Sequence, residues 1–466
     1  MRKSDVSQNK TVIINTISIV LIQGINFFTI PVFSRILGTG QYGIYSTFIA
    51  WLQVFSAIFG CSVGDGLATG RYKFEKEYSA FRSSILLLGT VLAGLLGCGL
   101  LIGNSIIQRI TGFDIKIILM LLLTATATFV ITFSNSAFIF EKRPQANLYI
   151  SAVLTISTVL LQFLFLGYNS DIVNSASMMI YGYCIPYVIT AILVWIVLFK
   201  EKPTLIRKPY AVFALQMGIP TVFHLLSNTI LTQSDRVMMY GMGISNNEIG
   251  IYSLYYNLSM VLCILLSALN KSWVPYFYDD LKNESYYQLK IKCRNYIELF
   301  TIITMGFLLL SREVGYLMGD KSFWSGIEVI PILTISTFFT FLYQFPVNFE
   351  FFYRKNAMIA IGTIFAAGCN VVLNIVFIPK WGMYGAAIAT MMSYFVLFLI
   401  HTFFVKVIMK QTLLIAMKDL MISIVCIMVA IGMFYFLHKY WYIRWGVGVL
   451  IGIFELKKIL DRKSIF

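Results

Sequence analysis

Polar side chains that lie inside long apolar stretches are the residues of this sequence best suited to chemistry. His224, Asn228 and Asp235 belong to one such stretch, where they follow one another at intervals of four and seven residues. These intervals place side chains on the same face of an α-helix. Polar residues inside a membrane-spanning helix are costly and usually face a bundle interior or a cavity. We therefore expect this face to line a hydrophilic cavity, with interhelical hydrogen bonding as the alternative.

A second polar set lies in the first apolar stretch of the chain. Gln23 and Asn26 interrupt this stretch, and Gln23 precedes His224 by 201 residues. The same interval separates Arg35 from Arg236, so polar groups recur at corresponding positions in two halves of the chain. We expect Gln23 and Asn26 to line the same cavity.

Arg35 and Arg236 are candidates for binding an anionic group, since each stands at the end of an apolar stretch. Arginine binds phosphate oxygens in a bidentate manner, and a diphosphate must be neutralised before it crosses a region of low dielectric constant. One alternative is that both side chains simply reach the membrane interface from apolar helices. Another is that Arg236 pairs with its neighbour Asp235.

The opposite charges of Asp65 and Lys271 predict a gate. These residues are 206 positions apart, close to the interval between the two halves of the chain. If they meet, they would close one end of the cavity, and Arg35 with Asp235 would close the other. An exposed ion pair contributes only about 0–1 kcal/mol, so separately solvated charges are the alternative.

The remaining reactive residue types form no recognisable site. The seven cysteines occur singly, without a Cys-x-x-Cys motif or a His/Cys cluster, so we expect neither a metal site nor a disulfide bond. Glu350 lies four residues before Arg354, a spacing that predicts a local ion pair on one helix. We place no Asp or Glu at mid-membrane depth, and we expect no cofactor and no enzymatic activity.

The composition identifies the class of protein that must position these groups. Of the 466 residues, 58% are hydrophobic and only 12% are charged, and the mean hydropathy is +0.80. Soluble domains carry about 25% charged residues. The composition therefore excludes a soluble enzyme, a disordered chain and a disulfide scaffold, and it predicts an integral membrane protein.

The apolar stretches predict an all-α polytopic membrane protein. A spanning helix needs about 20 mainly apolar residues. Dividing the sequence at charged and turn residues leaves fourteen such windows, at about 12–36, 42–63, 83–103, 117–140, 147–168, 174–199, 211–233, 250–271, 296–311, 326–349, 356–378, 382–405, 416–437 and 443–460.

The placement of Lys and Arg predicts the orientation of the helices, because cytoplasmic connections are rich in these residues. With a cytoplasmic N-terminus, 27 of the 36 Lys and Arg residues fall on the cytoplasmic side and nine on the other. We therefore expect both termini to be cytoplasmic. Most of the net charge of +15 then faces the anionic lipids of the inner leaflet, and it does not indicate binding to nucleic acid.

Short repeats predict two similar lobes. The tetrapeptide Gly-Ile-Tyr-Ser occurs at residues 43–46 and again at 250–253, and residues 143–146 resemble residues 354–357. The nearly constant interval predicts two six-helix lobes, residues 1–200 and 201–408, followed by two appended helices in residues 409–466. Lobes of the same topology are related by an axis along the membrane normal, as in alternating-access transporters.

Three groups of residues form motifs near the ends of apolar windows. They are Pro31–Gly38 with Gln41–Ser46, Ser234–Arg236 with Glu248–Ser253, and Pro379–Ala387. These motifs resemble those of Wzx-type lipid-linked oligosaccharide flippases, in the polysaccharide-transporter branch of the multidrug/oligosaccharidyl-lipid/polysaccharide exporter superfamily. The resemblance covers nearly the whole chain, since the fourteen windows agree with it as well.

This resemblance implies a substrate and a location. It implies that undecaprenyl-diphosphate-linked oligosaccharide units move from the cytoplasmic to the outer leaflet of a bacterial inner membrane, for a surface polysaccharide such as O-antigen or capsule. It also implies a polysaccharide polymerase and chain-length machinery as partners. The resemblance to this flippase family also implies a cationic cavity, which agrees with a phosphate-binding role for Arg35 and Arg236.

Two other functions remain open. A cation or drug exporter of the same superfamily would carry buried acids. A membrane polysaccharide polymerase or ligase would carry a large outer loop, whereas the longest predicted connections, about 64–82 and 272–295, are cytoplasmic.

Overall fold

The computed structural model describes residues 3–168, 174–411 and 415–462, with side chains from residue 27 to residue 461 of these ranges. All regular elements in the described ranges are helical, which confirms the predicted all-α fold. In the labels used below, η1, η2 and η4 are 3₁₀ helices and η5 is a π-helix.

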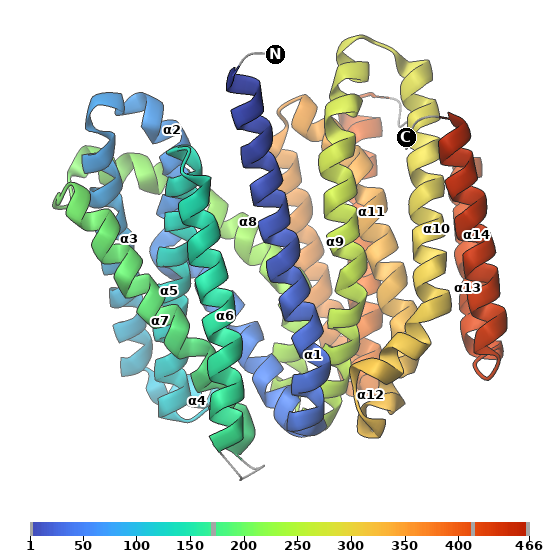
Figure 1. The fold of residues 1–466 in the computed structure, drawn as a ribbon, viewed down its shortest axis with the longest axis horizontal. Helices are drawn as coiled ribbons and strands as arrows, with labels where there is room; N and C mark the ends of the chain where they lie inside the picture. Colours follow the sequence, from blue (N-terminus) through green and yellow to red (C-terminus); the bar gives the residue numbers. More distant parts are fainter. Residues whose placement is uncertain (1–2, 169–173, 412–414, 463–466) are drawn as a thin grey trace. The chain divides into compact units, whose positions relative to one another are not determined.

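The elements follow the chain in a simple order (Figure 1). They are α1 Lys3–Ile58, η1 Phe59–Asp65, α2 Gly66–Lys73, η2 Glu75–Glu77, α3 Tyr78–Ile102, α4 Asn104–Thr111, α5 Ile115–Phe140, α6 Pro144–Tyr168, α7 Ser175–Glu201, α8 Lys208–Gly241, α9 Asn246–Lys282, α10 Tyr286–Met318, η4 Lys321–Val329, α11 Ile330–Phe352, α12 Asn356–Phe403, η5 Phe404–Ile408, α13 Met417–Phe436 and α14 Trp441–Arg462. Each of the predicted windows overlaps a helix of this series.

Two of these helices each contain two predicted windows. The backbone of α1 is non-helical at Gly38, where φ is 66°, and that of α12 at Gly382, where φ is 53°. Glycine adopts positive φ without the steric cost that a Cβ atom would bring. Each glycine therefore joins two helices that the sequence separates at the same place.

Ten helical stretches of the described chain are long and apolar enough to cross a membrane. The stretches 27–73 and 356–408 are among them, and each includes one of the glycine breaks. Neither α10 nor α14 is among the ten, in agreement with the short ninth window and the charges in α14.

The contacts of the chain divide it into two compact units, residues 1–250 and 251–466. This division does not test the predicted lobes, 1–200 and 201–408, because compactness does not report where a repeat begins. In the first unit, α5 is a central helix that packs against α1, α3, α6 and α7 (Figure 1). In the same unit α8 packs along α1 and η1.

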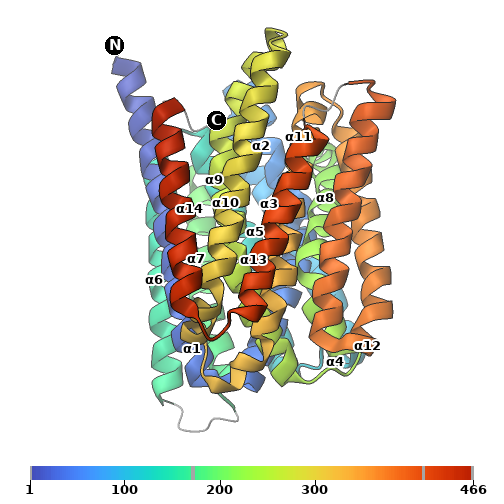
Figure 2. The ribbon, with the colours of Figure 1, turned by 90° about the vertical axis from the view of Figure 1, so that its right-hand side faces the viewer.

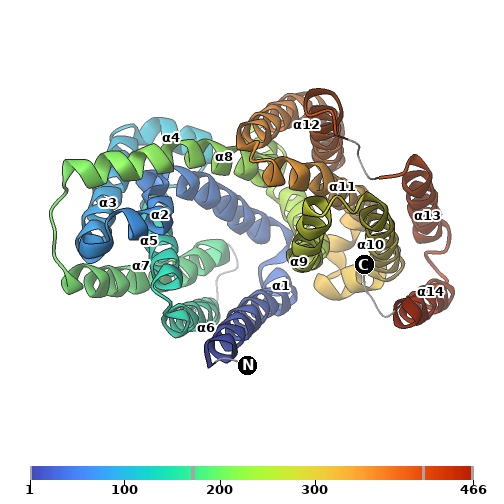
Figure 3. The same ribbon diagram turned by 90° about the horizontal axis from the view of Figure 1, so that it is seen from above.

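The second unit is built around aromatic side chains of α9, α10 and α11. Trp273, Tyr296 and Phe341 are fully buried, and the ring of Tyr296 lies 5.0 Å from each of the other two. α10 lies between α13 and α14 and packs against both (Figure 2). Seen from above, the two halves of α12 lie next to α11 (Figure 3).

Candidate functional site

The long helix α8 exposes a polar face. His224 and Asn228, one turn apart, are both exposed, and in the described part of the chain neither side chain makes a hydrogen bond. Their neighbour Phe223 is 60% exposed. Both side chains are therefore available to a polar ligand, and both residues remain candidates for a cavity lining.

The backbone of Gln23 and Asn26 belongs to α1. Their side chains lie outside the described residues. The prediction that they line the cavity therefore stays a prediction.

Arg236 is buried and held by its own helix. Its Nη1 donates to the carbonyl oxygen of Thr232 at 3.2 Å and to Oε1 of Gln233 at 3.0 Å. The Nε2 of Gln233 in turn donates to Oε1 of Gln53 on α1, at 3.0 Å. This amide relay connects the guanidinium to a second helix and fixes its position.

The two predicted phosphate-binding arginines have different environments. Arg35 is exposed, whereas Arg236 is only 4% exposed and its neighbour Asp235 is fully buried.

Sequence reasoning missed Gln53 and Gln233, although each is an amide within an apolar window and could have been noticed on that ground.

Asp65 ends η1 and contacts α8. Thr221 of α8 lies beside its carboxylate, and the hydroxyl of Thr221 donates to the carbonyl oxygen of Met217 at 3.2 Å. Lys271, its predicted partner, is exposed on α9 in the second unit. The pairing of Asp65 with Lys271 is therefore untested, while Thr221 is a neighbour that the sequence did not reveal.

The repeated Gly-Ile-Tyr-Ser motifs meet through their glycines. A Cβ atom on Gly43 would lie 1.9 Å from the carbonyl oxygen of Asn246, and one on Gly250 would lie 2.0 Å from that of Thr39. The hydroxyl of Thr39 also donates to Oδ1 of Asn247 at 3.0 Å. Each motif needs its glycine because both helices must lack a side chain where their backbones touch.

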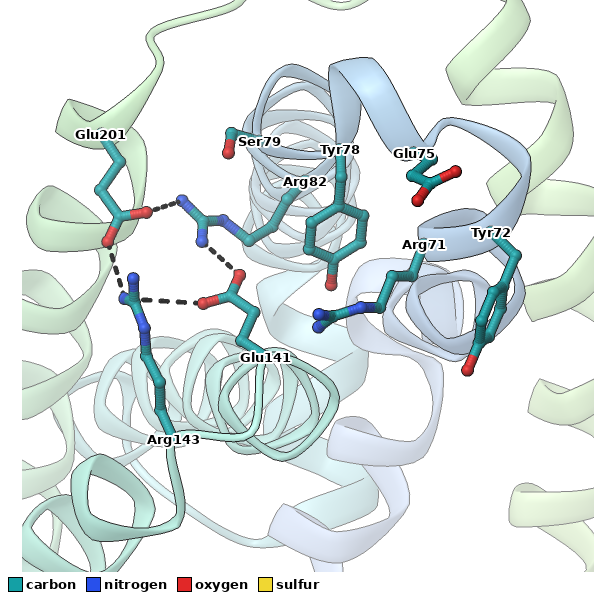
Figure 4. Close-up of a pocket in the computed structure, with 9 residues that line it drawn as sticks. All are labelled: Arg71, Tyr72, Glu75, Tyr78, Ser79, Arg82, Glu141, Arg143 and Glu201. Carbon is teal, nitrogen blue, oxygen red and sulfur yellow. Dashed lines mark hydrogen bonds and ion pairs between the residues drawn. The ribbon is translucent and has the colours of Figure 1, made fainter. Parts of the chain in front are cut away.

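A polar pocket of about 430 Å³ lies in the first unit (Figure 4). Arg82 is 1% exposed at its centre and donates to Oε1 of Glu141 at 2.5 Å and to Oε2 of Glu201 at 2.7 Å. Arg143 contacts the same two carboxylates, at 3.6 and 3.1 Å. Four alternating charges thus form a ring that joins α3 to the ends of α5 and α7. The lining residues are Arg71, Tyr72, Glu75, Tyr78, Ser79, Arg82, Glu141, Arg143 and Glu201.

A buried acid and imidazole pair joins α11 to α12. Glu350 and His401 are both fully buried, and Nδ1 of His401 lies 2.9 Å from Oε1 of Glu350 and 3.0 Å from Oε2. The other ring nitrogen of His401 is buried without a hydrogen-bond partner. The predicted pair of Glu350 with Arg354 is wrong, because Glu350 points into the unit while Arg354 is exposed after the helix end.

Two buried arginines attach the appended helices to α10. Arg444 of α14 pairs with Glu313 and donates to the carbonyl oxygen of Leu309 at 3.0 Å. Arg312 of α10 lies 2.9 Å from Glu328 and donates to the carbonyl oxygen of Phe434 on α13. These contacts satisfy the arginines within the unit and give them a structural role.

In residues 3–168, 174–411 and 415–462, no group of three or more His, Cys, Asp or Glu side chains could hold a metal ion.

A family profile described as polysaccharide biosynthesis protein matches residues 9–279. A protein of the Lsg locus of Haemophilus influenzae is 24% identical over 396 residues, which cover 79% of this chain and 92% of that protein. An uncharacterized membrane protein of the same organism is 25% identical over 383 residues, 77% of this chain and 89% of the relative.

Solved structures show a similar fold. The lipid II flippase MurJ in an inward closed conformation superposes with a TM-score of 0.73 and 16% identity, over 97% of this chain and 99% of that one. An inward-facing multidrug resistance MATE family transporter of the MOP superfamily gives a TM-score of 0.63 and 12% identity, over 86% and 99%. At these identities the likeness establishes the fold.

Proposed function

Because the chain belongs to the polysaccharide biosynthesis protein family, we propose that it is a flippase for undecaprenyl-diphosphate-linked oligosaccharides. The protein is a multi-pass membrane transporter of the multidrug/oligosaccharidyl-lipid/polysaccharide exporter superfamily. In our proposal it moves oligosaccharide units from the cytoplasmic to the outer leaflet of a bacterial inner membrane, with both termini cytoplasmic.

The observation that carries this proposal is the polar face of α8 within a flippase-like fold. His224 and Asn228 are exposed, and neither is engaged in a hydrogen bond within the described chain. Sugar hydroxyls both donate and accept hydrogen bonds, so an imidazole and an amide can bind them without a fixed charge. An apolar drug would gain nothing from these groups.

The arginines have a complementary role in the proposal. Arg35, which is exposed, would receive the diphosphate, and the fixed positive charge of Arg236 would stabilise it through the cavity wall. Gln23 and Asn26 would extend the polar lining. Asp65 with Lys271, and Arg35 with Asp235, would close the two ends in turn.

The proposed cycle uses the predicted lobes. Residues 1–200 and 201–408 would rock about the cavity so that it opens to one side at a time, while residues 409–466 remain attached to the second lobe. The cargo would come from enzymes that assemble lipid-linked sugars and would pass to a polymerase and chain-length machinery. Family members and fold neighbours are transporters and flippases rather than enzymes.

A cation or drug exporter is the second candidate, because one observation favours it. The exporter hypothesis predicts a buried acid, and Glu350 is fully buried beside His401. The two candidates differ in the charge of the cargo, so an experiment that compares an anionic lipid with an organic cation separates them.

Reconstitution into proteoliposomes tests the proposal. We expect the wild-type protein to expose a fluorescent undecaprenyl-diphosphate oligosaccharide to an external glycosidase and to leave a cationic dye untransported. Asn228→Leu should slow this exposure about tenfold, the effect of losing one or two hydrogen bonds. Phe223→Leu, at another exposed position of α8, is the matched control and should transport at the wild-type rate.

Two results would contradict the proposal. If the wild-type protein moved the cationic dye and not the lipid, the exporter candidate would replace it. If cells lacking the protein made the polysaccharide without accumulating lipid-linked oligosaccharide on the inner leaflet, the assigned cargo would be wrong.

A further inference from the structure

The amide relay connects the buried Arg236 to an exposed position of the first unit. Nη1 of Arg236 donates to Oε1 of Gln233, and Nε2 of Gln233 donates to Oε1 of Gln53, both at 3.0 Å. Gln233 precedes Arg236 by three residues on α8, and this spacing places them on one face of the helix. Gln53 belongs to α1, which packs against α8. The relay therefore runs from one helix to its neighbour.

The arginine determines the direction of both hydrogen bonds. A guanidinium has five N–H donors and no acceptor, so the Gln233 amide must turn its oxygen toward Arg236. The NH2 group of Gln233 then faces α1, where only the oxygen of the Gln53 amide can accept from it. The network thus fixes the orientation of both amides. The NH2 group of Gln53 is the free end of the relay.

This free end lies at an unusual position. Gln53 is the only exposed residue of the stretch 37–64, and its Nε2 donates to no group of the described residues. The stretch belongs to the candidate membrane span 27–73. Polar groups inside a spanning segment usually face a bundle interior or a water-filled cavity. The two N–H donors of Gln53 are therefore available to a ligand.

The relay gives these donors more positive character than an isolated glutamine has. Hydrogen bonds in a chain polarise one another, because each amide accepts at its oxygen and donates from its nitrogen. Arg236 is only 4% exposed, so water and salt screen its charge little. An acceptor that carries negative charge gains most from a donor of this kind. Phosphate oxygens meet this requirement, whereas sugar hydroxyls carry no charge.

We propose that the Gln53 amide contacts a phosphate oxygen of the cargo, and that Gln233 is a positioning residue that links this amide to the charge of Arg236. The inference rests on the proposed function, because the phosphate is that of the lipid diphosphate. It identifies the side chain that touches the anion while Arg236 itself stays buried.

Gln53→Leu tests the contact in the full-length protein. The substitution removes the terminal donors, so the dissociation constant for undecaprenyl diphosphate that carries no sugar should rise about tenfold. Gln216→Leu is the matched control, since Gln216 is another exposed glutamine of α8. Its dissociation constant should stay within about twofold of the wild-type value.

A double-mutant cycle tests the role of Gln233. Gln233→Leu interrupts the relay and should raise the same dissociation constant about threefold. In the Gln53→Leu background it should have no further effect, because the donor that it polarises is absent. Equal effects in both backgrounds would show that Gln233 does not act through Gln53, and the relay would be overturned.

Microscale thermophoresis of purified protein in dodecyl maltoside measures these constants, and thermal unfolding confirms that each variant is folded. Undecaprenol, which lacks the diphosphate, is the second probe, and its binding should not respond to Gln53→Leu. Wild-type affinity of Gln53→Leu for undecaprenyl diphosphate would overturn the phosphate contact. So would a loss confined to the lipid that carries the oligosaccharide, because the amide would then contact the sugar.

The result separates the phosphate contact from the transport. If diphosphate binding depends on Gln53 and proteoliposomes move no lipid-linked oligosaccharide, the contact stands and the proposed transport falls. If the oligosaccharide is transported and diphosphate binding does not respond to Gln53→Leu, the transport stands and the contact falls.

Discussion

The turns that follow α5 and α11 have the same backbone and different charges. Lys142 and Arg354 are left-handed, with φ of 59° and 55°. In the first turn the N–H of Arg143 donates to the carbonyl oxygen of Phe138, and in the second the N–H of Lys355 donates to that of Glu350. Both are helix endings of the Schellman type, 212 residues apart.

The backbone corrects the register of the predicted repeat. The sequence comparison matched Arg143 with Arg354, an interval of 211. The hydrogen bonds instead pair Arg143 with Lys355 and Lys142 with Arg354. The predicted register was wrong by one residue. The sequence comparison aligned two identical arginines, whereas the two turns correspond at their left-handed residues.

This register shows how the two units differ. Phe138 and Glu350 occupy corresponding positions, and both are buried. The first unit has an apolar ring there and keeps its acid at the rim, on Glu141, within the four-charge ring. The second unit buries the acid itself with His401. The two turns therefore have the same backbone conformation. Glu350 can be buried because His401 of the neighbouring helix is its hydrogen-bond partner.

The largest expected effect comes from removing the partner of the buried acid. His401→Leu leaves Glu350 without a hydrogen bond at a fully buried site, which should lower the free energy of unfolding by about 3–5 kcal/mol. Equilibrium unfolding in mixed detergent and SDS micelles measures this. The double variant His401→Leu with Glu350→Leu is the control, and it should recover most of the lost free energy of unfolding. If the double variant were as unstable as His401→Leu alone, the buried acid would not be the cause of the loss.

The second largest loss of stability should come from a substitution in the four-charge ring of the first unit. Arg82→Leu leaves Glu141 and Glu201 with the half-exposed Arg143 as their remaining partner in the ring. We expect the free energy of unfolding to fall by about 1.5–3 kcal/mol, the range for hydrogen bonds to charged groups. Arg82→Lys keeps the positive charge but loses the planar guanidinium that binds both carboxylates. The free energy of unfolding of this variant should therefore lie between those of the wild type and Arg82→Leu. Equal stability for lysine and leucine would mean that the charge itself contributes nothing.

The shared backbone predicts equal responses of the two turns to glycine. Lys142→Gly and Arg354→Gly each remove a Cβ atom from a left-handed residue and should stabilise the protein by about 0.5–1 kcal/mol. The corresponding alanine variants are the controls and should stay near wild type. A gain at one turn only would show that the turns are not equivalent.

The smallest expected effect is at the rim of the ring. Arg143 is 54% exposed while it contacts Glu201 at 3.1 Å, so Arg143→Ala should change the free energy of unfolding by about 0–1 kcal/mol. The change should shrink further in 0.5 M salt, because salt screens exposed charges. A loss as large as that of Arg82→Leu would show that the ring acts as one buried unit.

Much of the fold could be read from local sequence. Each apolar window became a helix because a spanning segment must satisfy its own backbone and match the bilayer thickness. The breaks at Gly38 and Gly382 could be placed because positive φ favours glycine. Part of the candidate site followed in the same way, since helical spacing put His224 and Asn228 on one exposed face of α8.

What the sequence could not supply is the choice of partners. His401 lies 51 residues from Glu350, and Glu201 lies 119 residues from Arg82, so neither pair has a local spacing signal. The left-handed turn at Cys61 and Ser62 was equally hidden, because nothing local favours it. Hydrophobic length and helical periodicity are properties of one segment, and the sequence alone determined them. Ion pairs, the glycine contact of Gly43 with Gly250 and the left-handed turn depend on which surfaces pack together, and only the tertiary structure decided that.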